Sequence, residues 1–148
     1  MGYYINVVDH DVLIPTDRMD AALHELKAMA MRKDQMGGGG FTGVGEPVAQ
    51  WFSWVDMQQL ANAETLVEAL EAWRYNFVKY DDGVVLEGFE GEKLGDDAFL
   101  WKTLAPFIKG GGFIEVHGEE REFWRWKFND GKFREVELQL TEVPYQRV

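Results

Sequence analysis

The C-terminal part of the chain alternates apolar and polar side chains with a period of two residues. From Gly112 onward it reads GFIEVHGEEREFWRWKFNDGKFREVELQL, and the alternation breaks at Gly-Glu-Glu and at Asn-Asp-Gly. A period of two places successive side chains on opposite faces of a strand, and short turns with glycine join antiparallel neighbours. The pattern predicts a three-stranded meander over residues 113–117, 121–128 and 132–140.

The length of the second turn decides which side chains of the meander share a face. A two-residue turn at Asp130 and Gly131 would place Trp126 opposite Glu135, so that apolar and charged side chains mix on one face. A three-residue loop that also includes Asn129, closed by a left-handed glycine, shifts the pairing by one residue and separates the two faces. We therefore expect the three-residue loop.

In this register, the apolar side chains of the meander gather on one face, which helices must cover. That face carries Ile114, Val116, Trp124, Trp126, Phe128, Val136, Leu138 and Leu140. The opposite face carries Glu115, His117, Phe123, Arg125, Lys127, Glu135, Glu137 and Gln139. Phe123 and Phe133 are then predicted to be aromatic rings on the polar surface, where such rings can anchor a partner.

Three other segments have the spacing of helices. Apolar residues recur at steps of three and four after a capping position at residues 16–17. Thr65 and Glu68 have the spacing of a capping box, and an apolar stripe follows them. A third helix is expected to begin near residues 96–97, because acidic side chains suit the positive end of the helix dipole. Each predicted helix has one apolar face to bury.

Further strands are predicted before the meander. Residues 3–14 are rich in β-branched and aromatic side chains, and a break at residues 9–11 indicates two short strands or one bulged strand. Residues 51–56 read as another short strand. Residues 75–80 and 84–89 predict two strands joined by a tight Asp-Asp-Gly turn.

Glycine is concentrated in one segment, residues 37–47, which reads GGGGFTGVGEP. Because glycine loses more backbone freedom on ordering than other residues, we expect a flexible loop here. The segment lacks the Lys-Ser/Thr pair of a phosphate-binding loop, and its glycine spacing does not complete a dinucleotide fingerprint. A lid over a site is the alternative interpretation.

Composition limits the class of protein. A chain of 148 residues with 46% hydrophobic residues suffices for a single α+β domain over residues 1–148, in which about three helices pack on one face of a mainly antiparallel sheet. The absence of cysteine excludes disulfides, thiolate metal sites and a cysteine nucleophile. The first residues, MGYYINVVDHD, contain neither a basic region nor an unbroken apolar run, so we expect a cytoplasmic protein without a signal peptide or membrane span.

The net charge of -11 argues against direct binding to nucleic acids or anionic membranes, because that binding depends on Lys and Arg displacing counterions. Residues 56–97 carry most of the excess, with eleven acidic and three basic side chains. A basic protein is therefore the expected kind of partner.

The most acidic segment is residues 81–97, DDGVVLEGFEGEKLGDD. Its carboxylates, together with two aromatic rings of the meander, are the predicted partner-binding residues: Glu87, Glu90, Glu92, Asp96, Asp97, Phe123 and Phe133. The alternative is a solvated edge that keeps an aromatic-rich domain soluble and prevents strand-edge aggregation.

No pattern identifies a catalytic residue, a metal ligand or a cofactor site. Asp9, His10 and Asp11 offer hard ligands, but no second cluster with ligand spacing accompanies them. His117 lies near two glutamates and could perform acid–base chemistry, but the end of a hairpin rarely supplies the enclosed pocket that shifts a pKa. We therefore predict none of the three.

Four stretches carry a resemblance to a known group of proteins: MGYY at the start, EKLGDDAFLWKTLAPFI, GFIEVHGEE and FWRWKFNDGKF. Together they resemble a family of small phage and actinobacterial proteins to which no activity is assigned. The resemblance covers the start of the chain and the part from Glu92 onward. It implies a phage-encoded or accessory origin, and it supplies no catalytic residues.

These observations predict a non-enzymatic acidic interaction or regulatory protein that binds a host macromolecule. One alternative is a small enzyme or ligand-binding protein with a cleft under the glycine-rich loop, which convergent carboxylates and a histidine in a pocket would favour. The other is a self-assembling homo-oligomer, which a mass measurement in solution would detect.

Overall fold

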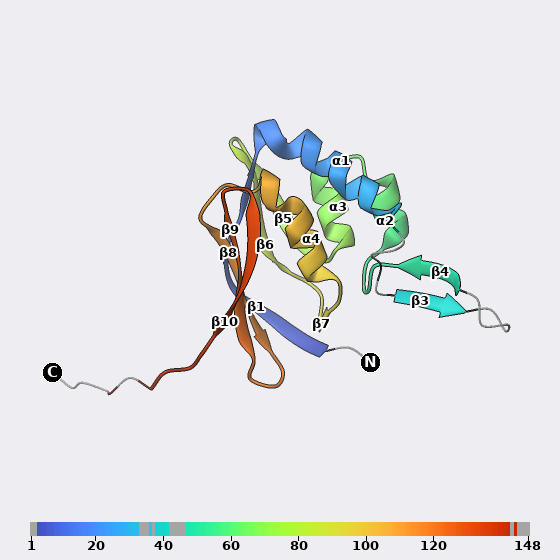
Figure 1. Cartoon of the computed structure of the whole chain (residues 1–148). Coiled ribbons are helices and arrows are strands. Elements are labelled where there is room, and N and C mark those ends of the chain that lie inside the picture. The colour runs from blue at the N-terminus through green and yellow to red at the C-terminus, as the bar shows by residue number, and fades with distance from the viewer. Residues whose placement is uncertain (1–2, 33–35, 37, 42–46, 143, 145–148) are drawn as a thin grey trace.

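The computed structural model describes residues 3–32, 36, 38–41, 47–142 and 144. These residues form a five-stranded sheet, a three-stranded sheet and a two-stranded hairpin, and every strand pair is antiparallel. Four α-helices gather on one side of the five-stranded sheet (Figure 1). The predicted α+β class with a mainly antiparallel sheet is confirmed, with one α-helix more than the sequence indicated.

The five-stranded sheet combines the predicted meander with the first strand of the chain. Its order is β10-β9-β8-β1-β7. The strands are β1 (Tyr3–Asp11), β7 (Lys93–Leu94), β8 (Gly112–Gly118), β9 (Phe123–Asn129) and β10 (Lys132–Leu138). β1 inserts between the meander and β7, so segments far apart in the sequence lie side by side.

The three-stranded sheet has the order β2-β6-β5, with β2 (Leu13–Pro15), β5 (Tyr75–Tyr80) and β6 (Gly83–Phe89). The first predicted segment therefore forms two strands, and the first of them is also bulged, since its register with β8 shifts between Val7 and Asp9. The predicted hairpin of β5 and β6 is confirmed, with Tyr80 opposite Gly83.

Side chains cap two of the four described α-helices, the second and the third, whereas the first and the fourth begin without a side-chain cap. The cap expected at residues 16–17 is therefore wrong, because these residues lie in a 3-10 turn before the first α-helix. The helices are α1 (Met19–Met29), α2 (Met57–Asn62), α3 (Leu66–Ala72) and α4 (Asp97–Leu104), with short 3-10 turns η1 (Thr16–Arg18) and η3 (Ala105–Phe107). The predicted cap of α3 is present, because Thr65 Oγ1 accepts a hydrogen bond from the Glu68 N–H at 3.2 Å. On α1, the expected face is buried through Ala22, Leu26 and Met29.

The strand expected at residues 51–56 is wrong. Strand β4 (Pro47–Trp51) ends where that strand was expected to begin, and Trp54 has a φ of 66° that no regular strand contains. Asp56 then starts α2, because its side chain accepts a hydrogen bond from the Gln59 N–H at 3.0 Å. An aspartate that caps a helix was misread as the end of an apolar strand.

Part of the glycine-rich segment is also ordered as a strand. β3 (Gly38–Phe41) pairs with β4, so the expectation of a continuous loop over residues 37–47 is wrong for these positions. Residues 37 and 42–46 lie outside the described residues. Backbone pairing satisfies the amides of a glycine strand without any side-chain contribution, which composition alone does not reveal.

The register of β9 and β10 differs from the expected one. Lys132 pairs with Asn129, so Asp130 and Gly131 form a two-residue turn. Both turn residues have positive φ, 54° and 73°, as a turn that matches the twist of the strands requires. Each β10 side chain therefore lies on the opposite face from the one predicted, and the three-residue loop is wrong.

The core lies between the helices and the sheets. Trp101 of α4 contacts Phe128 of β9 and Tyr75 of β5, with ring centroids 5.8 and 4.9 Å apart. Trp126 is 1% exposed on the covered face, whereas Arg125 and Lys127 are half-buried on the opposite face. The prediction that helices cover the tryptophan side of the meander is confirmed for β8 and β9.

Candidate functional site

A hollow of about 580 Å³ lies on the five-stranded sheet. The described residues that line it come from four strands and the position before β9: Tyr3, Leu94, Glu122, Phe123, Trp124, Glu135 and Glu137. In Figure 1, this end of the sheet, with β1, β7 and β10, extends below the helices. None of these lining residues belongs to a helix, so the hollow opens where the sheet extends past its helical cover.

Tyr3 forms the β1 wall of the hollow. Its hydroxyl donates a hydrogen bond to Glu122 Oε1 at 2.9 Å and accepts one from the Glu120 N–H at 3.2 Å. The hydroxyl lies against Gly118, where an added Cβ would come within 2.3 Å of it. Partial burial, together with the hydrogen bond to Glu122, raises the pKa of Tyr3, so the hydroxyl remains a donor at neutral pH.

Two glutamates of β10 stand opposite two tryptophans of β9. Glu135 pairs with Trp126 and Glu137 pairs with Trp124. The Trp126 Nε1–H donates a hydrogen bond to Glu135 Oε1 at 2.8 Å. An indole has a polar edge as well as an apolar ring, so a carboxylate can occupy the same face without loss of a hydrogen bond. This contact explains why the register that mixes the two kinds of residue is stable.

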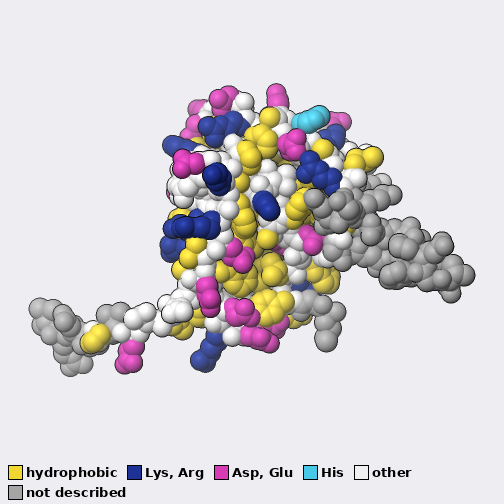
Figure 2. Space-filling view, in the orientation of Figure 1, with side chains coloured by type: hydrophobic (Ala, Val, Ile, Leu, Met, Phe, Trp, Pro, Cys, Tyr) yellow, Lys and Arg dark blue, Asp and Glu magenta, His cyan; other side chains and the backbone are white. Residues whose placement is uncertain are grey.

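Negative charge dominates the hollow. Three of the described lining residues are glutamates and none is Lys, Arg or His. Within the described part of the chain, none of the three glutamates forms an ion pair. On the face drawn in Figure 2, Asp and Glu side chains likewise stand beside hydrophobic side chains in the lower part of the molecule. Tyr3 and Trp124 add aromatic rings, whose faces attract cations.

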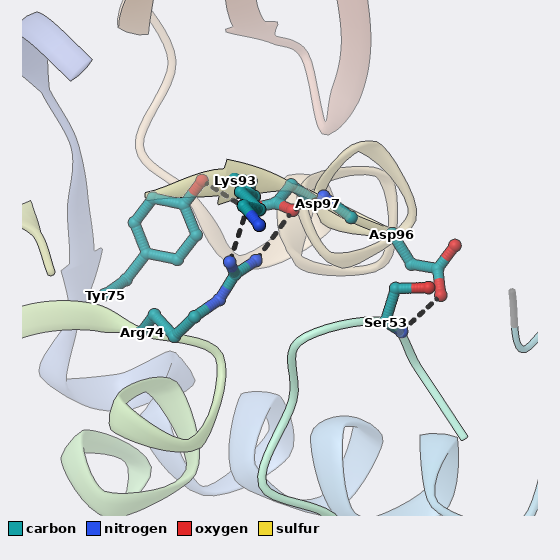
Figure 3. A network of polar contacts seen from close by, with 7 residues as sticks. Ser53, Arg74, Tyr75, Lys93, Asp96 and Asp97 are labelled. Atoms are coloured by element: carbon teal, nitrogen blue, oxygen red, sulfur yellow. Dashed lines mark hydrogen bonds and ion pairs between the residues drawn. The ribbon is translucent and has the colours of Figure 1, made fainter. Parts of the chain in front are cut away.

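A second polar arrangement is buried between α3 and α4 (Figure 3). Asp97 is 0% exposed and accepts hydrogen bonds from Arg74 Nη2 at 3.0 Å, the Tyr75 hydroxyl at 2.7 Å and the Gly95 N–H at 2.8 Å. Arg74 also donates to the Lys93 carbonyl oxygen at 2.6 Å. Burial raises the pKa of Asp97, although Arg74 and the hydrogen bonds favour its ionised form. All of these donors and acceptors belong to the protein itself. The network therefore links the end of α3 and the start of β5 to β7 and the start of α4.

The acidic segment does not form one continuous docking surface. Glu87, Glu90 and Glu92 are exposed, as the predicted surface requires. Asp97 is buried, so its place among the partner-binding residues was wrong. Asp96 is half-buried and accepts a hydrogen bond from the Ser53 N–H at 2.8 Å. Both carboxylates accept hydrogen bonds from backbone N–H groups outside α4, those of Ser53 and Gly95, so they hold neighbouring segments against the start of this helix.

The two predicted aromatic anchors are separated by the observed register. Phe123 borders the hollow, but its ring stays on the polar face, where it contacts the His117 ring with centroids 4.6 Å apart. Phe133 pairs with Phe128 on the covered face, and their ring centroids lie 6.1 Å apart. Phe133 is half-buried against the core, so its assignment as an exposed ring on the polar face was wrong.

Glu115, His117 and Arg125 form a cluster on the polar face. Glu115 Oε1 accepts from Arg125 Nε at 2.8 Å, and Glu115 Oε2 lies 3.0 Å from His117 Nε2. Burial acts to raise the pKa of Glu115, but the hydrogen bonds of Arg125 and His117 outweigh it and hold that pKa below its usual value. The cluster lies on an open sheet face, and its geometry is that of a cross-strand ion pair.

The Glu115 cluster predicts a pH dependence of stability. A carboxyl with a lowered pKa in the folded state stabilises the protein above its unfolded pKa, and this contribution is lost as the pH falls through the folded pKa. Glu115→Gln should lower the free energy of unfolding by about 1 kcal/mol at neutral pH. Denaturant unfolding of both proteins should show the difference shrinking toward zero in acid. If the difference in unfolding free energy stayed constant from neutral to acidic pH, the lowered pKa of Glu115 would be contradicted.

Asp9, His10 and Asp11 lie along β1, and Asp9 accepts a hydrogen bond from the His10 N–H at 2.9 Å. Among the residues that the structure describes, no group of three or more His, Cys, Asp or Glu side chains could hold a metal ion. In the same part of the chain, no helix is both long enough and apolar enough to cross a membrane.

The lining of the hollow was missed by sequence reasoning, except for Phe123. Its residues come from distant positions such as Tyr3, Leu94 and Glu137, and only the pairing of β1 with β7 and β8 brings these together. One local signal existed, since glutamates two residues apart at positions 135 and 137 share a strand face.

Comparison with known proteins adds no relative, since no protein-family model, curated protein or solved structure matches this chain.

Proposed function

We propose that this protein is a non-enzymatic binding protein for a basic protein partner, and that the hollow receives a Lys or Arg side chain of that partner. The observation that carries the proposal is the set of three glutamates, without a cationic neighbour among the described lining residues, around an aromatic-lined space of about 580 Å³. A Lys or Arg stem can pack on rings while its charged end meets carboxylates.

The net charge supports the same class of partner. At -11, the protein attracts basic surfaces over distances comparable to the Debye length and repels acidic ones. The hollow adds the local complementarity that a diffuse negative field lacks. The exposed carboxylates of Glu87, Glu90 and Glu92 then contribute to attraction at long range, whereas the hollow provides the contact.

A peptide with alternating lysines, acetyl-Lys-Thr-Lys-Thr-Lys-amide, tests the proposal against an uncharged peptide in which Gln replaces Lys. Binding is measured by isothermal titration calorimetry and by the fluorescence of the tryptophans, one of which, Trp124, lines the hollow. We expect the lysine peptide alone to bind, with an affinity that falls as salt rises.

Two matched triple variants locate the contact. Changing Glu122, Glu135 and Glu137 together to Gln should weaken binding by tenfold or more, since each ion pair contributes up to about 1 kcal/mol. Changing Glu87, Glu90 and Glu92 to Gln removes the same charge elsewhere and should weaken binding by less than about threefold. If the Glu87, Glu90 and Glu92 variant weakened binding more than the variant of the hollow, the contact would lie on the acidic segment. If the lysine peptide did not bind at all, the proposed function would be overturned.

A further inference from the structure

β10 is an edge strand whose backbone pairs with β9 alone in the described sheet. The Phe128 carbonyl oxygen accepts a hydrogen bond from the Gly111 N–H at 2.9 Å, so the backbone groups of Phe128 point toward β8. In an antiparallel pair, hydrogen-bonded and non-hydrogen-bonded residues alternate. Because Phe133 is opposite Phe128, its backbone groups point away from β9, and the same holds at every second residue, for Glu135 and Glu137.

The open edge and the hollow meet at Glu135 and Glu137. Both residues are exposed, and both line the hollow. Phe133, at the other end of the strand, is half-buried against the core. The free N–H and C=O groups of β10 are therefore accessible at the two positions whose carboxylates carry the charge of the hollow.

We propose that the partner binds as an added antiparallel strand along the free edge of β10, with Lys or Arg side chains two residues apart beside Glu135 and Glu137. This inference rests on the proposed function and specifies how the basic partner binds. A residue of the added strand that exchanges hydrogen bonds with Glu135 lies directly opposite it, and its side chain points to the same face. A basic segment with period two therefore satisfies the backbone edge and the carboxylates together.

Charge selects this occupant over a second copy of the chain. Antiparallel pairing of two β10 strands around Glu135 would place glutamates of the two copies opposite each other, and like charges at such positions are destabilising. The net charge of -11 on each copy adds further repulsion. The carboxylates thus discourage self-pairing of the edge and favour a basic strand.

Peptide N-methylation separates an added strand from a side-chain contact. In one version of the acetyl-Lys-Thr-Lys-Thr-Lys-amide peptide, the central Lys amide is N-methylated, which removes an N–H that would face β10 and adds a methyl group there. In the matched version, an adjacent Thr amide is N-methylated, and that N–H would face solvent. Both modifications restrict the peptide backbone similarly. The difference between the affinities of the two peptides therefore measures hydrogen bonding to the edge of β10.

We expect the Lys-methylated peptide to bind at least tenfold more weakly than the Thr-methylated peptide, with the Thr-methylated peptide close to the unmodified one. The added strand would be overturned if the two methylated peptides bound with equal affinity. The proposed function would still hold in that case, provided that the unmodified peptide bound and that the Gln variant of the hollow weakened its binding. Absence of binding by the unmodified peptide would overturn both. A homodimer in sedimentation analysis whose β10 amides are protected from hydrogen exchange would identify a second copy as the occupant and overturn the inference.

Discussion

Replacing Asp97 with Ala is expected to lower the free energy of unfolding by about 3–5 kcal/mol. The substitution removes the acceptor of hydrogen bonds from Arg74, Tyr75 and Gly95 at a carboxylate that is 0% exposed. Arg74 then keeps a charge without its carboxylate, at a side chain that is only 17% exposed. Removal of one partner from a buried pair leaves the other uncompensated, which is why the effect exceeds that of an ordinary cavity.

Denaturant unfolding at neutral pH measures this loss. Asp97→Asn, which keeps the size and one acceptor oxygen but presents an amide to Arg74, should fall between wild type and Asp97→Ala. Asp96→Ala is the matched control, because it removes the same charge from the neighbouring, half-buried residue and should cost about 1 kcal/mol. Similar losses for Asp96→Ala and Asp97→Ala would show that the buried network contributes little to stability.

Gly83→Ala is expected to destabilise the protein by about 3 kcal/mol or more, through overpacking and backbone strain together. An added Cβ would lie 2.2 Å from the Ile14 carbonyl oxygen and 2.9 Å from Pro15 Cα. These are backbone atoms of β2, which pairs with β6 at this position and cannot move aside without separation of the strands. The φ of Gly83, +149°, adds a conformation that other residues rarely adopt.

Gly88→Ala provides a control on the same strand. No heavy atom lies within 4 Å of a Cβ built at Gly88, so we expect a change within about 0.5 kcal/mol. Thermal unfolding of both variants, followed by circular dichroism, measures the difference. If Gly83→Ala unfolds at the same temperature as Gly88→Ala, the close approach of β2 to β6 is not a constraint on this fold.

The candidate site shows where sequence reasoning reached its limit. Glu87, Glu90 and Glu92 were correctly expected at the surface, because charged residues in turns and on strand edges rarely become buried. Asp97 carries the same charge and lies in the same acidic segment, yet it is buried. Asp97 is buried because Arg74 and Tyr75 donate hydrogen bonds to it. These two residues lie more than twenty positions earlier in the sequence, so no local pattern predicts the contact.

The turn at Asp130 illustrates a second limit. The hairpin itself was predictable, because Asp-Gly accepts the positive φ angles of a two-residue turn. Its register was not predicted correctly, because a wholly apolar Trp126 would exclude a neighbouring glutamate. The hydrogen bond from the Trp126 indole to Glu135 reverses that conclusion. The indole N–H of Trp126 and the two-residue Asp-Gly turn together favour the observed face of each β10 side chain.

The sequence by itself determined the antiparallel meander, the β5–β6 hairpin and the apolar faces of α1 and α3, because side-chain period and turn chemistry act within a few neighbouring residues. Only the tertiary structure decided that β1 lies between β8 and β7, and that Tyr3 meets Glu122 across the end of the sheet. Pairing between distant strands depends on which surfaces fit once the chain has collapsed, and the hollow exists because of that pairing.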